Sequence, residues 1–191
     1  MQSQYNEGFY TQEELKAFNF ASLGENILIS RLARIYGAQS ISIGNNVRID
    51  DFVILSGKVE IGSFVHLGAF SSITGGKVGV KIGDFCGMSS QSKIFATTDD
   101  FINGYLIGPC VPFESRNVIE KQVVLVRHCH IGSHSLVLPG SYFTIGACLG
   151  PMSLNMGRKL KEWSYYQGNP AKKIYNINKK NILQCESKIL G

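Results

Sequence analysis

The sequence has little proline, no long apolar run and no closely spaced pair of cysteines. Five prolines in 191 residues exclude a collagen-like or proline-rich chain. No apolar stretch approaches the roughly 18 residues of a membrane span, and the N-terminus lacks the basic and apolar regions of a signal peptide. The five cysteines include no Cys-x-x-Cys pair, which argues against a disulfide framework and a structural zinc site. We therefore expect a cytoplasmic protein that does not insert into a membrane.

Glycine, by contrast, is frequent, with 21 residues. Hydrophobic residues make up 44% of the chain and charged residues 17%, a balance that excludes a disordered protein. Much glycine with little proline suits many short strands joined by tight turns. The chain is long enough for one domain with a sizeable core and too short for two ordinary ones, so we expect a single domain over residues 1–191.

The net charge of +5 is concentrated at one end of the chain. From Arg158 onward there are eight basic and two acidic residues, whereas the rest of the chain carries eleven basic and twelve acidic ones. A basic tail can meet nucleic acid, an anionic membrane or a phosphorylated ligand, or can be a solvated helix. The near-neutral remainder lacks a basic stripe with interleaved aromatic residues, so we do not expect nucleic-acid binding.

An apolar residue recurs at every sixth position through most of the chain, and a small or β-branched residue usually follows four positions later. A period of six drifts around a helix, and one flat strand cannot continue for so many residues. The pattern instead predicts a short strand and a corner, repeated, so that three six-residue sides make one triangular coil. The recurring positions are Ile43, Ile49, Leu55, Ile61, Leu67 and Ile73, then Ile82, Met88 and Ile94, then Ile119, Leu125, Ile131, Val137, Phe143 and Leu149.

Stacked coils pair each strand with the coils above and below and bury one continuous core. We expect an all-β parallel β-helix, a hexapeptide solenoid, over residues 31–154, with an N-terminal cap over 1–30 and a C-terminal cap and tail over 155–191. The spacing leaves the hand of the helix open. The complete coils are predicted at 43–60, 61–78, 82–99, 119–136 and 137–154, above a partial coil at 31–42.

One long segment, residues 99–118, interrupts the repeat, which stops at Thr98 and resumes in register at Ile119. A long loop ejected from a regular solenoid is usually functional. The alternative is a purely structural overhang.

Helices are expected at both ends of the solenoid. Thr11 and Glu14 form the pattern of a capping box, which predicts a short helix through Ala17. Residues 173–190 are typical of a terminal helix that covers the last coil with Ile174, Ile177 and Leu183.

The repeat, the ejected segment and the tail sequence Gly168-Asn-Pro-Ala-Lys172 together resemble the hexapeptide-repeat acyltransferases. This resemblance implies a left-handed parallel β-helix, a homotrimer with sites between subunits, and acetyl-CoA or another acyl-CoA as the acyl donor.

Longer segments are similar to one branch of that family, which acylates amino sugars carried on a nucleotide. The similarity implies N-acetylation of a nucleotide-linked amino-dideoxy sugar such as dTDP-4-amino-4,6-dideoxyglucose, for surface polysaccharide or O-antigen synthesis. Many family members place a catalytic histidine at the start of the ejected loop, where this chain has none between His66 and His128. The similar segments are 9–15, 47–57, 65–66 and 98–101.

The missing histidine favours an amine over a hydroxyl acceptor, because an alcohol must lose its proton during attack whereas a free amine is already nucleophilic. Asp99 and Asp100, where the coil gives way to the loop, are the expected catalytic residues. A carboxylate can hold the amine and take its late proton, and burial together with a like-charged neighbour raises its pKa. The alternative is that one of them caps a turn.

Four further residues are candidates for substrate binding. Glu114 lies in the loop, Ser89 and Ser90 stand just before it, and His66 ends a six-residue side. Each also has a structural alternative: a solvated charge for Glu114, packing for the serines and an ordinary surface position for His66.

Coenzyme A is a long anionic ligand that suits a groove between solenoids and a basic tail. The candidates for binding it are small residues that allow close approach of a ligand, and residues of the basic tail. The small residues are Ser135, Gly150 and Ser153, and the tail residues are Arg158, Gly168, Ala171, Lys172 and Lys173. Their alternatives are cap packing and, for the lysines, solvation.

His128, His130 and His134 resemble a metal cluster at first sight. They stand at the fourth, sixth and fourth positions of the repeat and need not converge, so we expect no metal site. Two rival functions remain open: a sugar O-acetyltransferase of the same fold and a non-catalytic solenoid scaffold.

Overall fold

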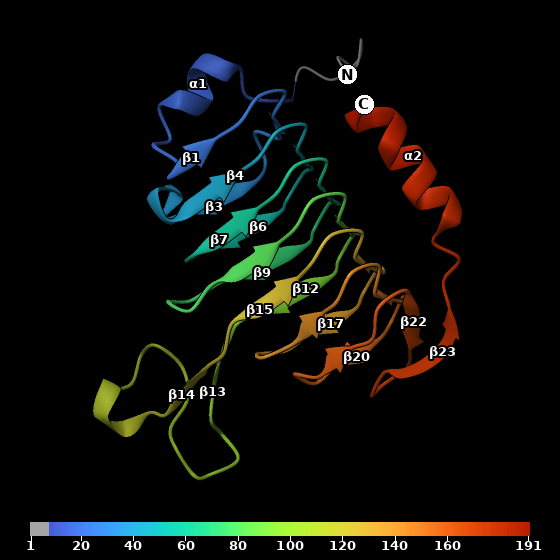
Figure 1. The fold of residues 1–191 in the computed structure, drawn as a ribbon. Coiled ribbons are helices and arrows are strands. Elements are labelled where there is room, and N and C mark those ends of the chain that lie inside the picture. The colour runs from blue at the N-terminus through green and yellow to red at the C-terminus, as the bar shows by residue number, and fades with distance from the viewer. Residues whose placement is uncertain (1–7) are drawn as a thin grey trace.

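The computed structural model describes residues 8–191, which wind into a triangular solenoid of parallel strands (Figure 1). The first seven residues of the predicted N-terminal cap lie outside the described part. Each side of the prism is one parallel sheet, because each strand pairs with its equivalents in the coils before and after it.

The first sheet holds seven strands and the second holds eight, of which the last is antiparallel. The first consists of β1 (Ser22–Leu23), β4 (Ile41–Ile43), β7 (Val59–Ile61), β10 (Val80–Ile82), β15 (Val123–Leu125), β18 (Tyr142–Phe143) and β21 (Lys159–Leu160). The second consists of β2 (Leu28–Ile29), β5 (Arg48–Ile49), β8 (His66–Leu67), β11 (Gly87–Met88), β16 (His130–Ile131), β19 (Cys148–Leu149), β22 (Ser164–Gln167) and β23 (Lys172–Asn176).

The third sheet has six strands, and a separate two-stranded ribbon carries the ejected loop. The third sheet consists of β3 (Arg34–Tyr36), β6 (Ile54–Ser56), β9 (Ser72–Thr74), β12 (Lys93–Phe95), β17 (Leu136–Val137) and β20 (Leu154–Asn155). The ribbon is β13 (Thr97–Asp99) with β14 (Val118–Glu120), and two short 3-10 turns lie at Ala38–Ser40 and Phe113–Ser115.

The core fills the prism with the apolar residues that recur every six positions. Ile49, Leu67 and Phe143 are fully buried, and the small residue four positions after each of them is buried as well, as at Ser71. Ile73 is also fully buried, but the residue four positions after it is the exposed Lys77. The interior is therefore built in layers, one per coil, as the repeat predicted.

The solenoid is longer than the predicted 31–154 at both ends. Strands β1 and β2 form a first coil inside the segment that was assigned to the N-terminal cap, and β21 and β22 continue the sheets beyond residue 154. Ile27 and Ile29 on one end and Leu160 on the other keep the core continuous there. Helix α1 (Gln12–Lys16) begins with the predicted capping box, in which the Thr11 hydroxyl accepts a hydrogen bond from the Glu14 amide.

The coil boundaries at the interruption differ from the prediction. Thr98 and Ile119 do not line the prism; they face each other in the antiparallel ribbon of β13 and β14. The wall ends at buried Ala96, and Lys121 rejoins it by donating its amide to the Ala96 carbonyl at 2.9 Å. Ile119 keeps the six-residue spacing of the repeat but does not point into the prism, because the ribbon that contains it extends away from the solenoid (Figure 1).

The terminal segment also differs from the prediction of one helix over 173–190. Residues Lys172–Asn176 form β23, antiparallel to β22, and the helix α2 is confined to Lys180–Leu190. The open edge of β22 presents unpaired amides and carbonyls, which β23 satisfies. Helix α2 then turns back along the outside of the coils (Figure 1). Ile174 is exposed and Leu183 is 38% exposed, so they do not cover the last coil.

A ladder of aromatic rings occupies one corner of the solenoid. Phe64, Phe85 and His128 stack with ring centroids 4.6 and 5.3 Å apart, and His128 lies 5.8 Å from Trp163. Gly146 occupies the equivalent corner between the last two, at φ +68°. Its missing side chain leaves the space that the Trp163 ring fills.

We expect Gly146→Ala to destabilise the solenoid. The added methyl carbon would clash with Cε3 of Trp163, and overpacking of this kind costs about 1–3 kcal/mol. Thermal unfolding followed by circular dichroism should show Tm lower by about 2–4 °C per kcal/mol. Gly104→Ala is the matched control, because Gly104 also has a positive φ, of +83°, but no atom lies near its added carbon. Equal shifts for the two variants would contradict the role given to Trp163.

Candidate active site

A strip of outward-facing residues crosses four neighbouring coils on the second sheet. Arg48 pairs in register with His66, His66 with Gly87, and Gly87 with His130. The residue after each of them points inward and is buried, so strand alternation directs this row toward solvent. Residues far apart in the sequence thus become neighbours at the spacing between strands.

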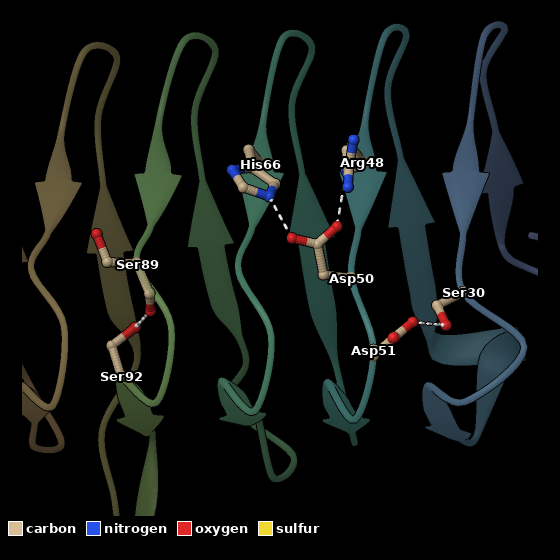
Figure 2. A network of polar contacts seen from close by, with 7 residues as sticks. All are labelled: Ser30, Arg48, Asp50, Asp51, His66, Ser89 and Ser92. Atoms are coloured by element: carbon tan, nitrogen blue, oxygen red, sulfur yellow. Dashed lines mark hydrogen bonds and ion pairs between the residues drawn. The ribbon is translucent and has the colours of Figure 1, made fainter. Parts of the chain in front are cut away.

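His66 is held by a polar network that continues into the coil before it (Figure 2). The His66 Nε2 atom lies 2.7 Å from Asp50 Oδ2, and Arg48 Nε donates to Asp50 Oδ1 at 2.7 Å. Burial opposes the charge on Asp50, but the hydrogen bonds from Arg48 and His66 prevail and lower the pKa of its carboxyl. The adjacent Asp51 turns away and accepts a hydrogen bond from the Ser30 hydroxyl.

His66 is a candidate on sequence grounds, whereas Asp50 and Arg48 are not among the predicted site residues. A signal was present, because Arg48 precedes His66 by one full coil and both lie in segments similar to the amino-sugar branch. Stacking at one coil's spacing is what brings them together.

On the other side of Gly87, the strip continues with His130 and Ser89. The Ser89 hydroxyl oxygen lies 3.0 Å from His130 Nε2, within hydrogen-bond distance. Burial, and after it the charge of His66, lower the pKa of His130. Ser89 is partly buried, and its carbonyl accepts a hydrogen bond from the buried Ser92 hydroxyl at 2.7 Å (Figure 2). Ser90 is exposed at the adjoining corner.

Asp99 and Asp100 lie at the base of the ejected loop, and both carboxylates are engaged within it. Asp99 accepts hydrogen bonds from the Gly108 amide at 2.8 Å and from the Arg116 guanidinium at 2.7 Å. These two contacts lower the pKa of Asp99. Asp100 accepts from the side chains of Asn103 and Asn117, and the Asn103 hydrogen bond, against burial, lowers its pKa.

The expectation that burial and a like-charged neighbour raise these pKa values is therefore wrong. The two carboxylates point to different partners, and donors surround each of them. Asp100 also accepts the Asn103 amide, which is the turn-capping alternative. Glu114 is exposed on the 3-10 turn farther along the loop.

The residues expected to bind coenzyme A fall into two groups. Ser135, Gly150 and Ser153 are buried, so the structure contradicts their expected accessibility. The Ser135 hydroxyl donates to the Gly150 carbonyl at 2.7 Å, and the Ser153 hydroxyl accepts from the Gly168 amide at 2.9 Å. Small residues at these positions serve the packing between coils.

The second group is the tail. Lys172 and Lys173 are exposed on β23, and Arg158 is exposed just before β21. Gly168 precedes a cis Asn169–Pro170 peptide bond, and buried Ala171 donates its amide to the Leu154 carbonyl. Among the tail candidates, the basic side chains are therefore available for a ligand.

The three histidines that suggested a metal do not converge. His128 stacks in the aromatic ladder, His130 lies in the strip and His134 stands at another corner with φ +58°. Among residues 8–191 no group of three histidine, cysteine, aspartate or glutamate side chains is placed to hold a metal ion. In the same range, neither helix has the length and apolar character that crossing a membrane requires.

Comparison with known proteins links these features to one family. The bacterial transferase hexapeptide (six repeats) family matches residues 40–75. The dTDP-4-amino-4,6-dideoxy-D-glucose acyltransferase of Escherichia coli is 38% identical over 177 residues, which are 91% of this chain and 91% of that protein.

Solved structures agree with the sequence match. An N-acyltransferase from Bacillus cereus, AntD, was crystallised with dTDP-4-amino-4,6-dideoxyglucose and coenzyme A as a variant with one serine replaced by alanine. It is 43% identical, covers 97% of this chain and 98% of its own, and superposes with a TM-score of 0.94. A hexapeptide-repeat acetyltransferase from Vibrio cholerae, 14% identical over 91% of this chain and 84% of its own, shares the fold with a TM-score of 0.56.

The solenoid of about seven turns is thus a left-handed parallel β-helix. These likenesses show that the chain belongs to the hexapeptide-repeat acyltransferases, in the branch of the dTDP-4-amino-4,6-dideoxyglucose acyltransferases.

Proposed function

We propose that this protein is an acyl-CoA-dependent N-acyltransferase that acts on the amino group of dTDP-4-amino-4,6-dideoxyglucose. The observation that carries the proposal is the match over nearly the whole chain to an acyltransferase named for that sugar and to a structure that holds the sugar with coenzyme A. Another AntD structure contains 3-hydroxybutyryl-CoA, so acyl groups longer than acetyl belong among the donors to be tested.

The polar strip is the proposed seat of the amino sugar. His66 presents a ring that Asp50 orients, and Ser89 and Ser90 supply hydroxyl groups one coil farther on. Such groups hold a sugar by hydrogen bonds and orient its amine for attack on a thioester.

Asp99 and Asp100 remain proposed participants, with Glu114 as a weaker one. AntD structures include variants with one aspartate replaced by alanine or asparagine, and others with one serine replaced. With lowered pKa values, the carboxylates of Asp99 and Asp100 suit hydrogen bonding to an ammonium group better than proton removal.

A homotrimer with its sites between subunits is part of the proposal. In one chain the loop extends away from the solenoid (Figure 1), and no described contact joins its carboxylates to the strip. The loop of one subunit meeting the strip of the next would complete a site.

The exposed basic tail is the proposed place for the phosphates of coenzyme A. Lys172, Lys173 and Arg158 carry the charges, with Gly168 and Ala171 shaping the turn next to them. We further propose a cytoplasmic enzyme whose product enters surface polysaccharide or O-antigen synthesis.

The first prediction of this proposed function concerns the acceptor of the acyl group. The purified protein should transfer acetyl or 3-hydroxybutyryl groups to dTDP-4-amino-4,6-dideoxyglucose and not to the matched sugar with a hydroxyl at that position, because a free amine needs no strong base to attack. Free thiol release together with mass spectrometry of the product measures this. Acylation of the hydroxy sugar alone would identify the O-acetyltransferase, and binding of neither ligand would identify the scaffold.

The second prediction concerns the tail. Lys172→Ala combined with Lys173→Ala should raise the KM for acyl-CoA about tenfold with little change in kcat, since two phosphate contacts are lost before the chemical step. The matched control is Lys180→Ala combined with Lys188→Ala on α2, which removes the same charge. Equal effects of the two double variants would mean that net charge alone matters.

The third prediction concerns Asp99. Asp99→Asn should loosen the loop, because the Arg116 ion pair is lost, and should lower turnover while Tm hardly changes. Limited proteolysis of the segment 101–116 and kcat measure these effects. Because the pKa of Asp99 is lowered, wild-type loop protection should persist at pH values above its ordinary pKa of about 3.8 and be lost only below it. A loop that is equally protected in the variant would contradict this assignment.

A further inference from the structure

The proposed reaction needs a group that takes a proton from the sugar. An amino group is largely protonated near neutral pH and attacks a thioester only as the free amine. Asp99 and Asp100 have pKa values below those of ordinary carboxyls, which makes them weak proton acceptors. The acceptor must therefore lie elsewhere in the site.

The strip contains a serine and a histidine in contact. The Ser89 hydroxyl oxygen lies 3.0 Å from Nε2 of His130, which belongs to the next coil. The Ser89 backbone is itself held from two sides, since its carbonyl accepts the Ser92 hydroxyl and its amide donates to the Ile131 carbonyl at 2.8 Å. The two side chains are thus positioned by the frame of the solenoid.

The surroundings of His130 favour the neutral form of its ring. Burial and the nearby His66 lower its pKa below the ordinary value of about 6.5. The ionisable groups that face it are His66 across Gly87 and the Cys148 thiol from the following strand, whose pKa burial raises. Asp50, the closest acid of the strip, is engaged by His66 and Arg48.

Gly87, which has no side chain, leaves space for the imidazole ring of His130. An added Cβ at this position would lie 3.0 Å from His130 Nδ1, closer than ordinary contact. Because Gly87 does not have a positive φ, an alanine there can adopt the same backbone and acts only through this contact. The gap between the two imidazole rings is therefore kept open by the absence of a side chain.

Resting on the proposed function, we infer that Ser89 and His130 form a proton relay: the Ser89 hydroxyl contacts the sugar amine, and His130 accepts the proton through it. The ammonium gives one proton to the serine oxygen as the serine hydroxyl proton passes to Nε2. The free nitrogen then attacks the thioester carbonyl, the nitrogen–carbon bond forms and the carbon–sulfur bond breaks. The second nitrogen proton leaves with the sulfur as free coenzyme A thiol, and His130 returns its proton to solvent.

The test is a pH profile of kcat/KM for wild type, Ser89→Ala and His130→Asn. Both variants should lose about 100- to 10,000-fold in kcat, the usual contribution of a positioned base. The fall in activity toward acid pH that reflects His130 should disappear in His130→Asn. The double variant should be no worse than the worse single one, because the two residues act as a unit. His134→Asn is the matched control and should leave the profile unchanged.

Two further variants separate the relay from a merely structural role. His66→Asn removes a charge that lowers the pKa of His130, so this pKa should rise. The fall of kcat/KM on the acid side of the pH profile should then move toward higher pH, whether or not sugar binding also changes. Gly87→Ala should lower kcat without removing any ionisable group, because it displaces the His130 ring.

Calorimetric binding of the dTDP-sugar and of coenzyme A distinguishes failure of the relay from failure of the proposed function. If the His130→Asn variant binds both ligands and keeps the wild-type rate and pH profile, the relay is wrong while the proposed function stands. A wild-type protein that binds the ligands without acylating the amine would refute the proposed function itself.

Discussion

The register of parallel hydrogen bonds between successive coils positions both the apolar core and the polar strip. Because every strand pairs with its equivalent one coil away, each position of the repeat becomes a row along the prism. Inward rows supply the layered apolar core, and outward rows set polar side chains beside one another at strand spacing. The strip from Arg48 to His130 is one such row, and the aromatic ladder from Phe64 to Trp163 is another.

Within the strip, neighbouring groups and burial shift the pKa values of Asp50 and His130. Asp50 is kept ionised by Arg48 and His66, while burial and the same His66 favour the neutral form of His130. Gly87 separates the two rings and leaves room between them. In a rigid solenoid such an arrangement needs little additional free energy, because backbone pairing that the core already stabilises positions the side chains.

The ejected loop is held together by its own polar contacts and not by pairing between coils. It leaves the wall through the short ribbon of β13 and β14 and is tied together by its own polar contacts, in which Asp99 joins Gly108 to Arg116 and Asp100 joins Asn103 to Asn117. The carboxylates that looked like free catalytic groups in the sequence are therefore also what gives the loop its shape. The groups that donate hydrogen bonds to them lie up to 17 residues away along the chain. Two adjacent aspartates in the sequence do not indicate which distant residues will donate to them.

From the sequence alone, the solenoid, most of its core positions, the capping box of α1 and the place of the interruption could be predicted, because a period of six constrains short strands directly. The family branch was also readable from its motifs. Only the tertiary structure decided that Ile119 lies in the ribbon, that Lys172–Asn176 pairs with β22, that Ser135 and Ser153 are buried, and that Asp50 and His130 join the strip. Those outcomes depend on which atoms meet across coils and at an open sheet edge, and residues one or more coils apart carry no local mark of such contacts.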